Sequence, residues 1–387
     1  MGTGAAFIGV GYSAVDRRTD RSLLSYAHEA SLDALRAAGI APDAVDGYVG
    51  IGSNPNPSAA VGDGADHVSA YLLVDSLGLG PLGWVSDVSG FAVNMAATAA
   101  AAIRAGSCSV VLGVRAVSAG SVAGRTRPGG PSSARPGADE SAAESAGRAG
   151  FAAGEDQWTR PFGAGPPGTR FALRMRQYLE RSGATRSEVF QVVRAARAHA
   201  ANNPVAYFRN TDVMLDEYLD APMVADPLSR LDCDLPVTGA GAFVLVSDSL
   251  ARDRPAAYLR AHTNWTNADT ILDRAGLIST DIDVCQLYDG YSFMVYEWLE
   301  RLGWCDENTA WKFVADGHTR PGGDLPVNTF GGALGEGRLH GMGHLREGIV
   351  QVMGVAGARQ VDDVEHCLVQ IGPFDRSALA VLSREGQ

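Results

Sequence analysis

The sequence predicts a layered α/β protein made of two successive halves, with an insertion in the first. Segments with buried-strand patterning alternate with helical ones along most of the chain. The alternation starts afresh at about Pro255, which marks the second half. Between Ala119 and about Pro167 the residues are mainly Gly, Ser, Pro and Ala. Such a composition cannot form a packed core, so we expect a mobile loop or lid there.

In the first half, strands and helices follow one another at the spacing of α/β units. The opening strand carries a glycine turn, and an amphipathic helix that ends in glycine follows it. After the insertion, helical periodicity returns from Arg170 to Ala201. The other expected elements are strands at 4–13, 45–53, 108–118 and 241–248, helices at 20–39 and 67–78, and an Ala-rich buried helix that ends near 106.

The second half repeats the alternation with shorter connections. It opens with two strands and closes with two strands that follow a glycine-rich loop and a helix. The expected elements are strands at 256–264, 283–289, 365–372 and 377–383, and helices at 290–303 and 345–357.

Composition excludes several classes of protein. The chain has 387 residues, 46% of them hydrophobic and 20% charged, which suits one large or two medium globular domains. Its net charge of −12 argues against nucleic acid as a partner. No apolar run is long enough to span a bilayer, and no charged segment followed by an apolar one opens the chain, so we expect a cytoplasmic protein.

The reactive residue types narrow the chemistry further. Five cysteines stand singly, which argues against a zinc cluster and a disulfide framework. The single lysine, Lys312, has no neighbours that would activate it, so we interpret it as a solvated residue rather than a Schiff-base amine. Two glycine-rich stretches, at 9–13 and 113–124, complete neither a GxGxxG nor a phosphate-loop pattern, which argues against NAD or ATP.

A sharp turn from strand to helix lies in WVSDVSGFAVNMA at 84–96. Such turns often present a nucleophile to the amides of a helix terminus. Here the residue at the turn is Asp87, which is not a nucleophile of that kind, so the turn has the form of an active site without its usual reactive group.

Five stretches, taken together and in order, resemble the thiolase superfamily, in particular the sterol-carrier-protein-X thiolases and their lipid-transfer-protein relatives. They are AHAANNPVAYFRN at 198–210, PMVADPLSRLDCDLPVTGAGAFVLVSD at 222–248, CQLYDGYSF at 285–293, LPVNTFGGALGEGRLHGMGH at 325–344 and VQIGPFDRSALAVLS at 369–383. The resemblance implies a thiolase fold, in which two similar βαβαβαββ halves form five layers, α-β-α-β-α. It places the halves at 1–250 and 251–387, with a loop domain inserted at about 119–230.

All four catalytic positions of a thiolase are changed in this chain. Asp87 stands where the nucleophilic cysteine of CxSG would be, and Tyr288 replaces the histidine of HDCF. Arg338 replaces the histidine of GHP when residues are counted without gaps from Gly331, and Gln370 replaces the acid–base cysteine. Without a thiolate, thiolysis through an acyl-enzyme is excluded.

Chains of this pattern are similar to thiolase-like aldolases, which cleave a β-hydroxyacyl-CoA, such as a steroid side chain or another bulky polycyclic acyl group, into a ketone and a shorter acyl-CoA. The resemblance implies a tyrosine base, and Tyr288 is our candidate. We expect Arg338 or a protonated histidine to lower its pKa. Tyr291 is the reserve, unless it faces the core. Two alternatives stay open: an acyltransferase or condensing enzyme of secondary metabolism, and a non-catalytic acyl-CoA-binding subunit.

The remaining candidates surround that tyrosine. His340 is either a proton relay or enolate donor, or a histidine that satisfies loop carbonyls; Asp87 either bonds the tyrosine or caps the next helix. Asp289 and Asn328 are candidate orienting residues. His344 and Glu347 have a spacing that suits metal ligands, but no clear third ligand exists, so we expect no metal.

The resemblance also implies partners. We expect an acyl-CoA thioester as substrate, with CoA as part of it and no covalently bound cofactor. We also expect a homodimer whose buried edge is the strand at 108–118, and a small OB-fold subunit with a zinc ribbon that completes a heterotetramer.

Overall fold

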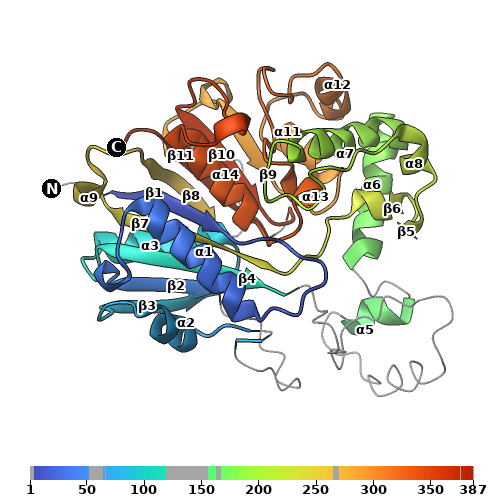
Figure 1. Ribbon diagram of the computed structural model, residues 1–387. Coiled ribbons are helices and arrows are strands. Elements are labelled where there is room, and N and C mark those ends of the chain that lie inside the picture. The colour runs from blue at the N-terminus through green and yellow to red at the C-terminus, as the bar shows by residue number, and fades with distance from the viewer. Residues whose placement is uncertain are drawn as a thin grey trace, which may run out of the picture.

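Nine strands form one mixed sheet, in the order β3-β2-β4-β7-β1-β8-β11-β10-β9 (Figure 1). The computed structural model describes residues 4–51, 64, 65, 67–118, 156–162, 167–264, 270–374 and 376–386. The strands of the first half are β1 (Ala5–Tyr12), β2 (Gly47–Ile51), β3 (Trp84–Val88), β4 (Val110–Val117) and β7 (Gly239–Ser247). Those of the second half are β8 (Ala257–Asn264), β9 (Val284–Leu287), β10 (His366–Ile371) and β11 (Ala378–Ser383). The two groups meet at β1 and β8, through two residue pairs.

The two groups of strands have the same internal order. A bridge between Cys285 and Val327 supplies the equivalent of a fifth strand in the second half, next to β9. In each half the strands then lie in the order third, second, fourth, fifth, first along the sheet. The prediction of two similar halves is therefore confirmed.

Helices separate the sheet into layers. α3 (Ala92–Arg104) and α14 (Met342–Met353) contact strands of both halves and each other, and form the central layer. α1 (Leu23–Ala38) and α2 (Ala70–Leu77) share an apolar cluster with the other face of the first half. α10 (Ile271–Ala275), α11 (Met294–Arg301) and α7 (Arg186–Ala200) do the same for the second half. Three apolar clusters between five layers confirm the predicted α-β-α-β-α arrangement.

The alternation of side chains along β1 shows why the sequence folds in this way. Ala5 and Phe7 pack toward the central helices, while Ala6 and Ile8 pack toward α1. Both faces of this strand are buried, so it is apolar throughout, as expected for a strand covered on two sides.

The helices between the halves pack over the second half, although they are inserted in the first (Figure 1). They are α6 (Pro167–Ser182), α7 and α8 (Leu215–Leu219), with a hairpin of β5 (Met223–Ala225) and β6 (Leu228–Ser229), while the short α5 (Asp156–Thr159) lies apart from them. The rings of Tyr178 on α6 and Tyr296 on α11 stack 5.6 Å apart, and Arg174 pairs with Glu297 at 2.8 Å. The predicted helix at 170–201 is thus two helices. Most of the predicted lid, 119–155 and 163–166, lies outside the described residues.

Three expectations need correction. The helix predicted at 345–357 starts at Met342 and ends at Met353, because Gly354 adopts a positive φ of 74° that closes the last turn. The short helices α12 (Ala310–Ala315) and α13 (Gly332–Gly335), together with α9 (Asp248–Ala251), were not predicted. The strand predicted as the dimer edge, at 108–118, is β4, which lies inside the sheet between β2 and β7; the first half instead ends at β3.

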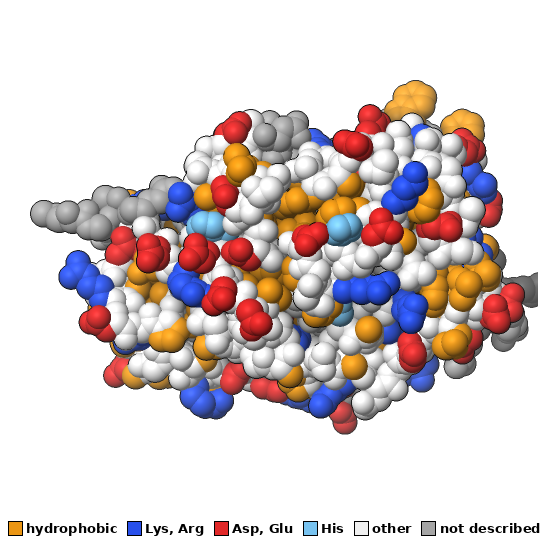
Figure 2. Space-filling model, turned by 90° about the horizontal axis from the view of Figure 1, so that it is seen from above, with side chains coloured by type: hydrophobic (Ala, Val, Ile, Leu, Met, Phe, Trp, Pro, Cys, Tyr) orange, Lys and Arg blue, Asp and Glu red, His pale blue; other side chains and the backbone are white. Residues whose placement is uncertain are grey.

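The surface carries charges of both signs. On the face seen from above, acidic and basic side chains are interspersed with apolar ones, and neither sign forms a continuous field (Figure 2).

Within the part of the chain that the structure describes, no helix has the length and apolar character needed to cross a membrane.

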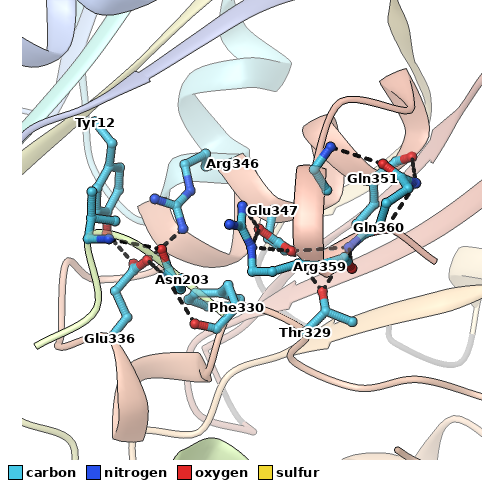
Figure 3. A network of polar contacts seen from close by, with 12 residues as sticks. Tyr12, Asn203, Thr329, Phe330, Glu336, Arg346, Glu347, Gln351, Arg359 and Gln360 are labelled. Carbon is cyan, nitrogen blue, oxygen red and sulfur yellow. Dashed lines mark hydrogen bonds and ion pairs between the residues drawn. The ribbon is translucent and has the colours of Figure 1, made fainter. Parts of the chain in front are cut away.

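A buried polar network joins α14 to the rest of the fold (Figure 3). The Glu336 carboxylate is fully buried and accepts hydrogen bonds from Arg346 at 2.5 Å, from Asn203 at 2.6 Å and from the Tyr12 hydroxyl. The Arg346 guanidinium also lies 4.0 Å from the centre of the Tyr12 ring. A second cluster on the same helix links Glu347 to Arg359 at 3.0 Å.

Replacing Arg346 by methionine should destabilise the protein strongly. The substitution leaves the Glu336 carboxylate buried without its cation, which typically costs about 3–5 kcal/mol of unfolding free energy. Urea denaturation followed by circular dichroism measures this loss. Arg346→Met combined with Glu336→Gln should recover part of it, since no buried charge then remains. A double variant as unstable as the single one would show that the pair does not act through charge.

Candidate active site

Three segments that are distant in sequence meet at the carboxyl end of β9. They are 233–236, which precedes β7; 288–291, which follows β9; and 337–341, which joins α13 to α14. Their backbones are tied directly: the Asp234 amide donates to the Gly290 carbonyl at 3.1 Å, and the Arg338 amide donates to the Leu235 carbonyl at 2.8 Å. These bonds bring the side chains of Asp234, Tyr288 and Arg338 together.

The backbone of Tyr288 is held by β10. Its amide donates to the carbonyl and to the side-chain oxygen of Gln370, at 3.1 and 3.0 Å. Gln370 is fully buried and also donates to the Gly372 carbonyl at 2.7 Å. The ring of Tyr288 folds back over Gly290, where a Cβ atom would lie 2.5 Å from it. Glycine in YDGYS is therefore required by this close approach.

The Tyr288 hydroxyl lies 3.4 Å from Oδ2 of Asp234, and the other oxygen of Asp234 accepts from Arg338 at 3.2 Å. Burial raises the pKa of Asp234 to about 7, although Arg338 acts to lower it. Burial, with the nearby carboxylates of Asp234 and Asp289, raises the pKa of Tyr288 well above its usual value. The expectation that Arg338 brings the pKa of Tyr288 into the working range is therefore wrong, because burial outweighs it.

His340 lies on the same loop, in a left-handed conformation with φ of 49°. Its Nδ1 lies 2.9 Å from Nη2 of Arg115, near the end of β4. Burial and the two guanidinium groups of Arg115 and Arg338 lower the pKa of His340 to about 3, so the ring is neutral at physiological pH. The histidine predicted to be protonated near the tyrosine is thus not His340.

Asp289 and His344 form a buried pair, with Nε2 of His344 3.0 Å from Oδ1 of Asp289. Asp289 also accepts from the amides of Ala333 and Leu334, at 2.7 and 3.0 Å, and so caps the short helix α13. The His344 ring lies 5.7 Å from that of Tyr288. The pair therefore positions the site loop and packs beneath the tyrosine.

Asn328 and Asp87 take no direct part in this cluster. The Asn328 amide group bonds both the N–H and the C=O of Leu287, at 2.8 Å each, and so extends the ladder of β9. Asp87 lies in β3 beside Tyr48 and contributes to raising the pKa of that tyrosine. Its side chain shares the face of Tyr48, which packs with α1 rather than with the central helices. It does not cap α3; at the start of that helix the Asn94 side chain accepts a hydrogen bond from the amide of Phe91 at 2.8 Å.

Tyr291 and Cys233 flank the tyrosine. The two residues pair through an isolated bridge, and the Tyr291 ring stacks on Phe171 of α6 at 4.6 Å. Burial raises the pKa of Tyr291 above its usual value and that of the Cys233 thiol to about 12. Cys233 donates to the Ser229 carbonyl at 3.4 Å. Tyr291 thus lies partly in the insertion interface, and the thiol stays protonated.

Sequence reasoning missed Asp234, Arg115 and the position of Cys233. Asp234 is one of two aspartates in LDCDLP, and only contacts distinguish them: Asp232 is bonded to Ser229, Tyr218 and Ser292 as a structural group. Arg115 gave a signal, since it is a charged residue near the end of an apolar strand, where sites often lie in α/β folds. Lys312 is exposed on α12 beside Trp311, as expected. Among the described residues, no group of three or more His, Cys, Asp or Glu side chains could hold a metal ion.

Comparison with known proteins places the chain in a family. Residues 258–384 match the model of the thiolase C-terminal domain-like family. A 17-hydroxy-3-oxo-4-pregnene-20-carboxyl-CoA lyase of Mycobacterium tuberculosis is 32% identical over 95% of this chain and 96% of its own length. The chain belongs to the thiolase superfamily. Its place is among the thiolase-like aldolases and lyases, since a steroid side-chain-cleaving aldolase of Thermomonospora curvata is 31% identical over 95% of both chains.

The solved structure of an Ltp2-ChsH2(DUF35) aldolase has the same fold as this thiolase-superfamily chain. The two superpose with a TM-score of 0.81 at 28% identity, covering 100% of this chain and 99% of the other. A monomeric SCP2-thiolase-like protein of Mycobacterium smegmatis superposes with a TM-score of 0.70 at 17% identity, which supports the fold alone. The fold inferred from five motifs is therefore confirmed over the whole chain.

Proposed function

We propose that this chain is a carbon–carbon lyase that cleaves a β-hydroxyacyl-CoA, with a steroid or other bulky polycyclic acyl group, into a ketone and a shorter acyl-CoA. Its relatives at 31–32% identity carry names of that activity. One observation in the site carries the proposal: the Tyr288 hydroxyl lies beside a buried carboxylate, Asp234, which titrates near neutral pH. CoA enters as part of the substrate, and no other cofactor is needed for a retro-aldol step.

A proton relay explains how a tyrosine with a raised pKa acts as base. The oxygen of Tyr288 accepts the proton of the β-hydroxyl group as its own proton passes to the Asp234 carboxylate. The bond between the α and β carbons breaks, the hydroxyl carbon becomes the ketone, and the electron pair moves into the thioester enolate. The proton then returns through Tyr288 to the α carbon, which completes the shorter acyl-CoA. Arg338 favours the ionised form of Asp234, which is the form that can accept the proton.

The described thiols do not support acyl transfer as an alternative. Cys233 is the cysteine beside Tyr291, and its raised pKa keeps it a thiol at neutral pH. Cys108, Cys285 and Cys367 are buried and Cys305 is partly buried, and burial raises the pKa of each. A thiolate nucleophile therefore has no place in the proposed reaction.

Tyr288→Phe should abolish cleavage while leaving the fold intact. The change removes one hydroxyl and keeps the ring, and loss of a general base typically costs about two to four orders of magnitude in rate. Release of the ketone from a β-hydroxyacyl-CoA, measured by chromatography, gives the rate. Asp234→Asn should cause a comparable loss, because the relay then has no acceptor.

Three matched variants separate this mechanism from its competitors. Tyr291→Phe and Cys233→Ser should stay within a few-fold of the wild type, and so should Lys312→Ala, since no acyl-enzyme or Schiff base forms. An inactive Cys233→Ser with an active Tyr288→Phe would favour acyl transfer. Wild-type protein that binds acyl-CoA but cleaves no β-hydroxyacyl-CoA would favour the non-catalytic subunit.

The pH dependence should follow Asp234. Because its pKa is about 7, kcat/KM should fall about tenfold per unit as the pH drops well below 7, where the carboxylate is protonated. Arg338 lowers this pKa, so Arg338→Gln should move the acidic limb to higher pH by about one unit. Arg36→Gln, at an exposed arginine, should leave the limb in place. A limb that stays or moves to lower pH in Arg338→Gln would contradict the assignment.

Assembly belongs to the same proposal. We infer a homodimer formed at β3, because this strand ends the sheet and the side chain of Val85 on it is exposed. The solved relative is named for two components, Ltp2 and ChsH2(DUF35). This name supports a second subunit. We propose that it is a small OB-fold protein with a zinc ribbon, that it completes a heterotetramer, and that the assembly is cytoplasmic. We further propose domain boundaries at 1–250 and 251–387, with the loop domain at about 119–230.

Light scattering should report a dimer at micromolar concentration for the wild type. Val85→Lys should shift the mass toward the monomer, since a charge on an edge strand opposes pairing. Ile278→Lys, which changes an exposed apolar residue elsewhere, should remain dimeric. A monomeric wild type would refute the dimer, and a dimeric Val85→Lys would exclude the β3 edge.

A further inference from the structure

Arg115 is a cation beside the proton relay with no carboxylate partner among the described residues. Its Nη2 donates to Nδ1 of His340 at 2.9 Å, and its buried Nε has no hydrogen-bond partner. Asp234 is paired instead with Arg338. Burial lowers the pKa of Arg115 to about 10, so the guanidinium is still charged at neutral pH.

Buried arginines in this fold are held in two ways. Arg197 is bonded to the Leu334 carbonyl and lies against the Phe208 ring, whereas two others are paired with carboxylates. Arg346 is matched to Glu336 and Arg359 to Glu347, each at 3.0 Å or less. A buried cation without a counterion is unfavourable unless an anion enters its site. The environment of Arg115 therefore suits an anionic ligand.

His340 adds a second donor at the same place. Arginine has only donors, so Nδ1 of His340 must accept from it, and a neutral ring then carries its proton on Nε2. The left-handed backbone at His340 and the backbone pairing of Arg338 with Leu235 hold the loop that carries this ring. A guanidinium and an imidazole N–H are therefore fixed together.

We propose that Arg115, with Nε2–H of His340, binds the enolate oxygen that forms on the shorter acyl-CoA. Arg115 is bonded to His340, which stands two residues after Arg338, the partner of Asp234, so the cation lies against the loop that completes the proton relay. When the bond between the α and β carbons breaks, its electron pair forms the enolate and the thioester oxygen takes the negative charge. That oxygen would be the anionic partner that Arg115 lacks among the described residues. The inference rests on the proposed retro-aldol function.

Binding of an enolate mimic tests this without turnover. Carboxymethyl-CoA carries a carboxylate where the enolate has its charge, and carbamoylmethyl-CoA is its neutral amide counterpart. Calorimetry should show the wild type binding the carboxylate about 10–100-fold more tightly than the amide, as expected for one charge-assisted contact. Arg115→Gln should remove this preference, Arg115→Lys should keep part of it, and the exposed-site control Arg36→Gln should retain it in full.

Turnover gives the second measurement. Arg115→Gln should lower kcat by about 10²–10³-fold with a small change in KM, because the contact forms as charge develops. A thermal melt within a few degrees of the wild type shows that the variant is folded, and Arg115→Lys provides a cationic variant if glutamine disturbs the fold.

The outcomes distinguish the two proposals. A wild type that prefers the carboxylate through Arg115 but cleaves no β-hydroxyacyl-CoA refutes the function and leaves the anion site standing. Cleavage that survives in Arg115→Gln, or an undiminished preference for the carboxylate in that variant, overturns the assignment of Arg115.

Discussion

The buried Glu336 carboxylate is the constraint on which the site depends. It receives hydrogen bonds from β1 through Tyr12, from the segment after α7 through Asn203, and from α14 through Arg346. These three elements come from both halves and from the insertion, so one charge joins all parts of the chain (Figure 3). Glu336 stands two residues before Arg338, so its hydrogen bonds hold the start of the site loop in place. Because each donor is buried, the geometry is satisfied only when all the segments are in place.

Burial, more than residue type, decides which groups in the site are charged. Asp234 is held near its titration point because desolvation opposes the pull of Arg338. The same desolvation keeps Tyr288 protonated and His340 neutral. Tyrosine alone would be a poor base here, but a tyrosine that passes its proton to a carboxylate of matched pKa is a competent one. In our proposal, Tyr288 and Asp234 together can therefore accept the proton that the tyrosine alone cannot.

Strand and helix periodicity were sufficient to predict the two α/β halves. The five layers and the candidate position of Tyr288 came from the resemblance to the thiolase superfamily, which rests on the order of five motifs. The sequence did not show that β3, rather than β4, ends the sheet, since strand order is a property of tertiary pairing. It also misassigned Asp87, which faces α1, and missed Asp234 and Arg115. Their importance comes from contacts across more than a hundred residues, such as that between Asp234 and Arg338. In the sequence LDCDLP nothing distinguishes the structural Asp232 from Asp234 in the candidate site.

Two arginines near one histidine explain how a thiolase fold can work without its thiolate. In this chain Arg338 is paired with Asp234, the proton acceptor that we propose, whereas Arg115 has no carboxylate partner in the part of the chain that the structure describes. Our proposals thereby assign two roles to separate residues: the Asp234 carboxylate takes the proton that leaves the substrate, and the Arg115 guanidinium binds the negative charge that forms. A retro-aldol step moves a proton and a charge in opposite directions along the substrate, so this division of roles suits cleavage better than acyl transfer.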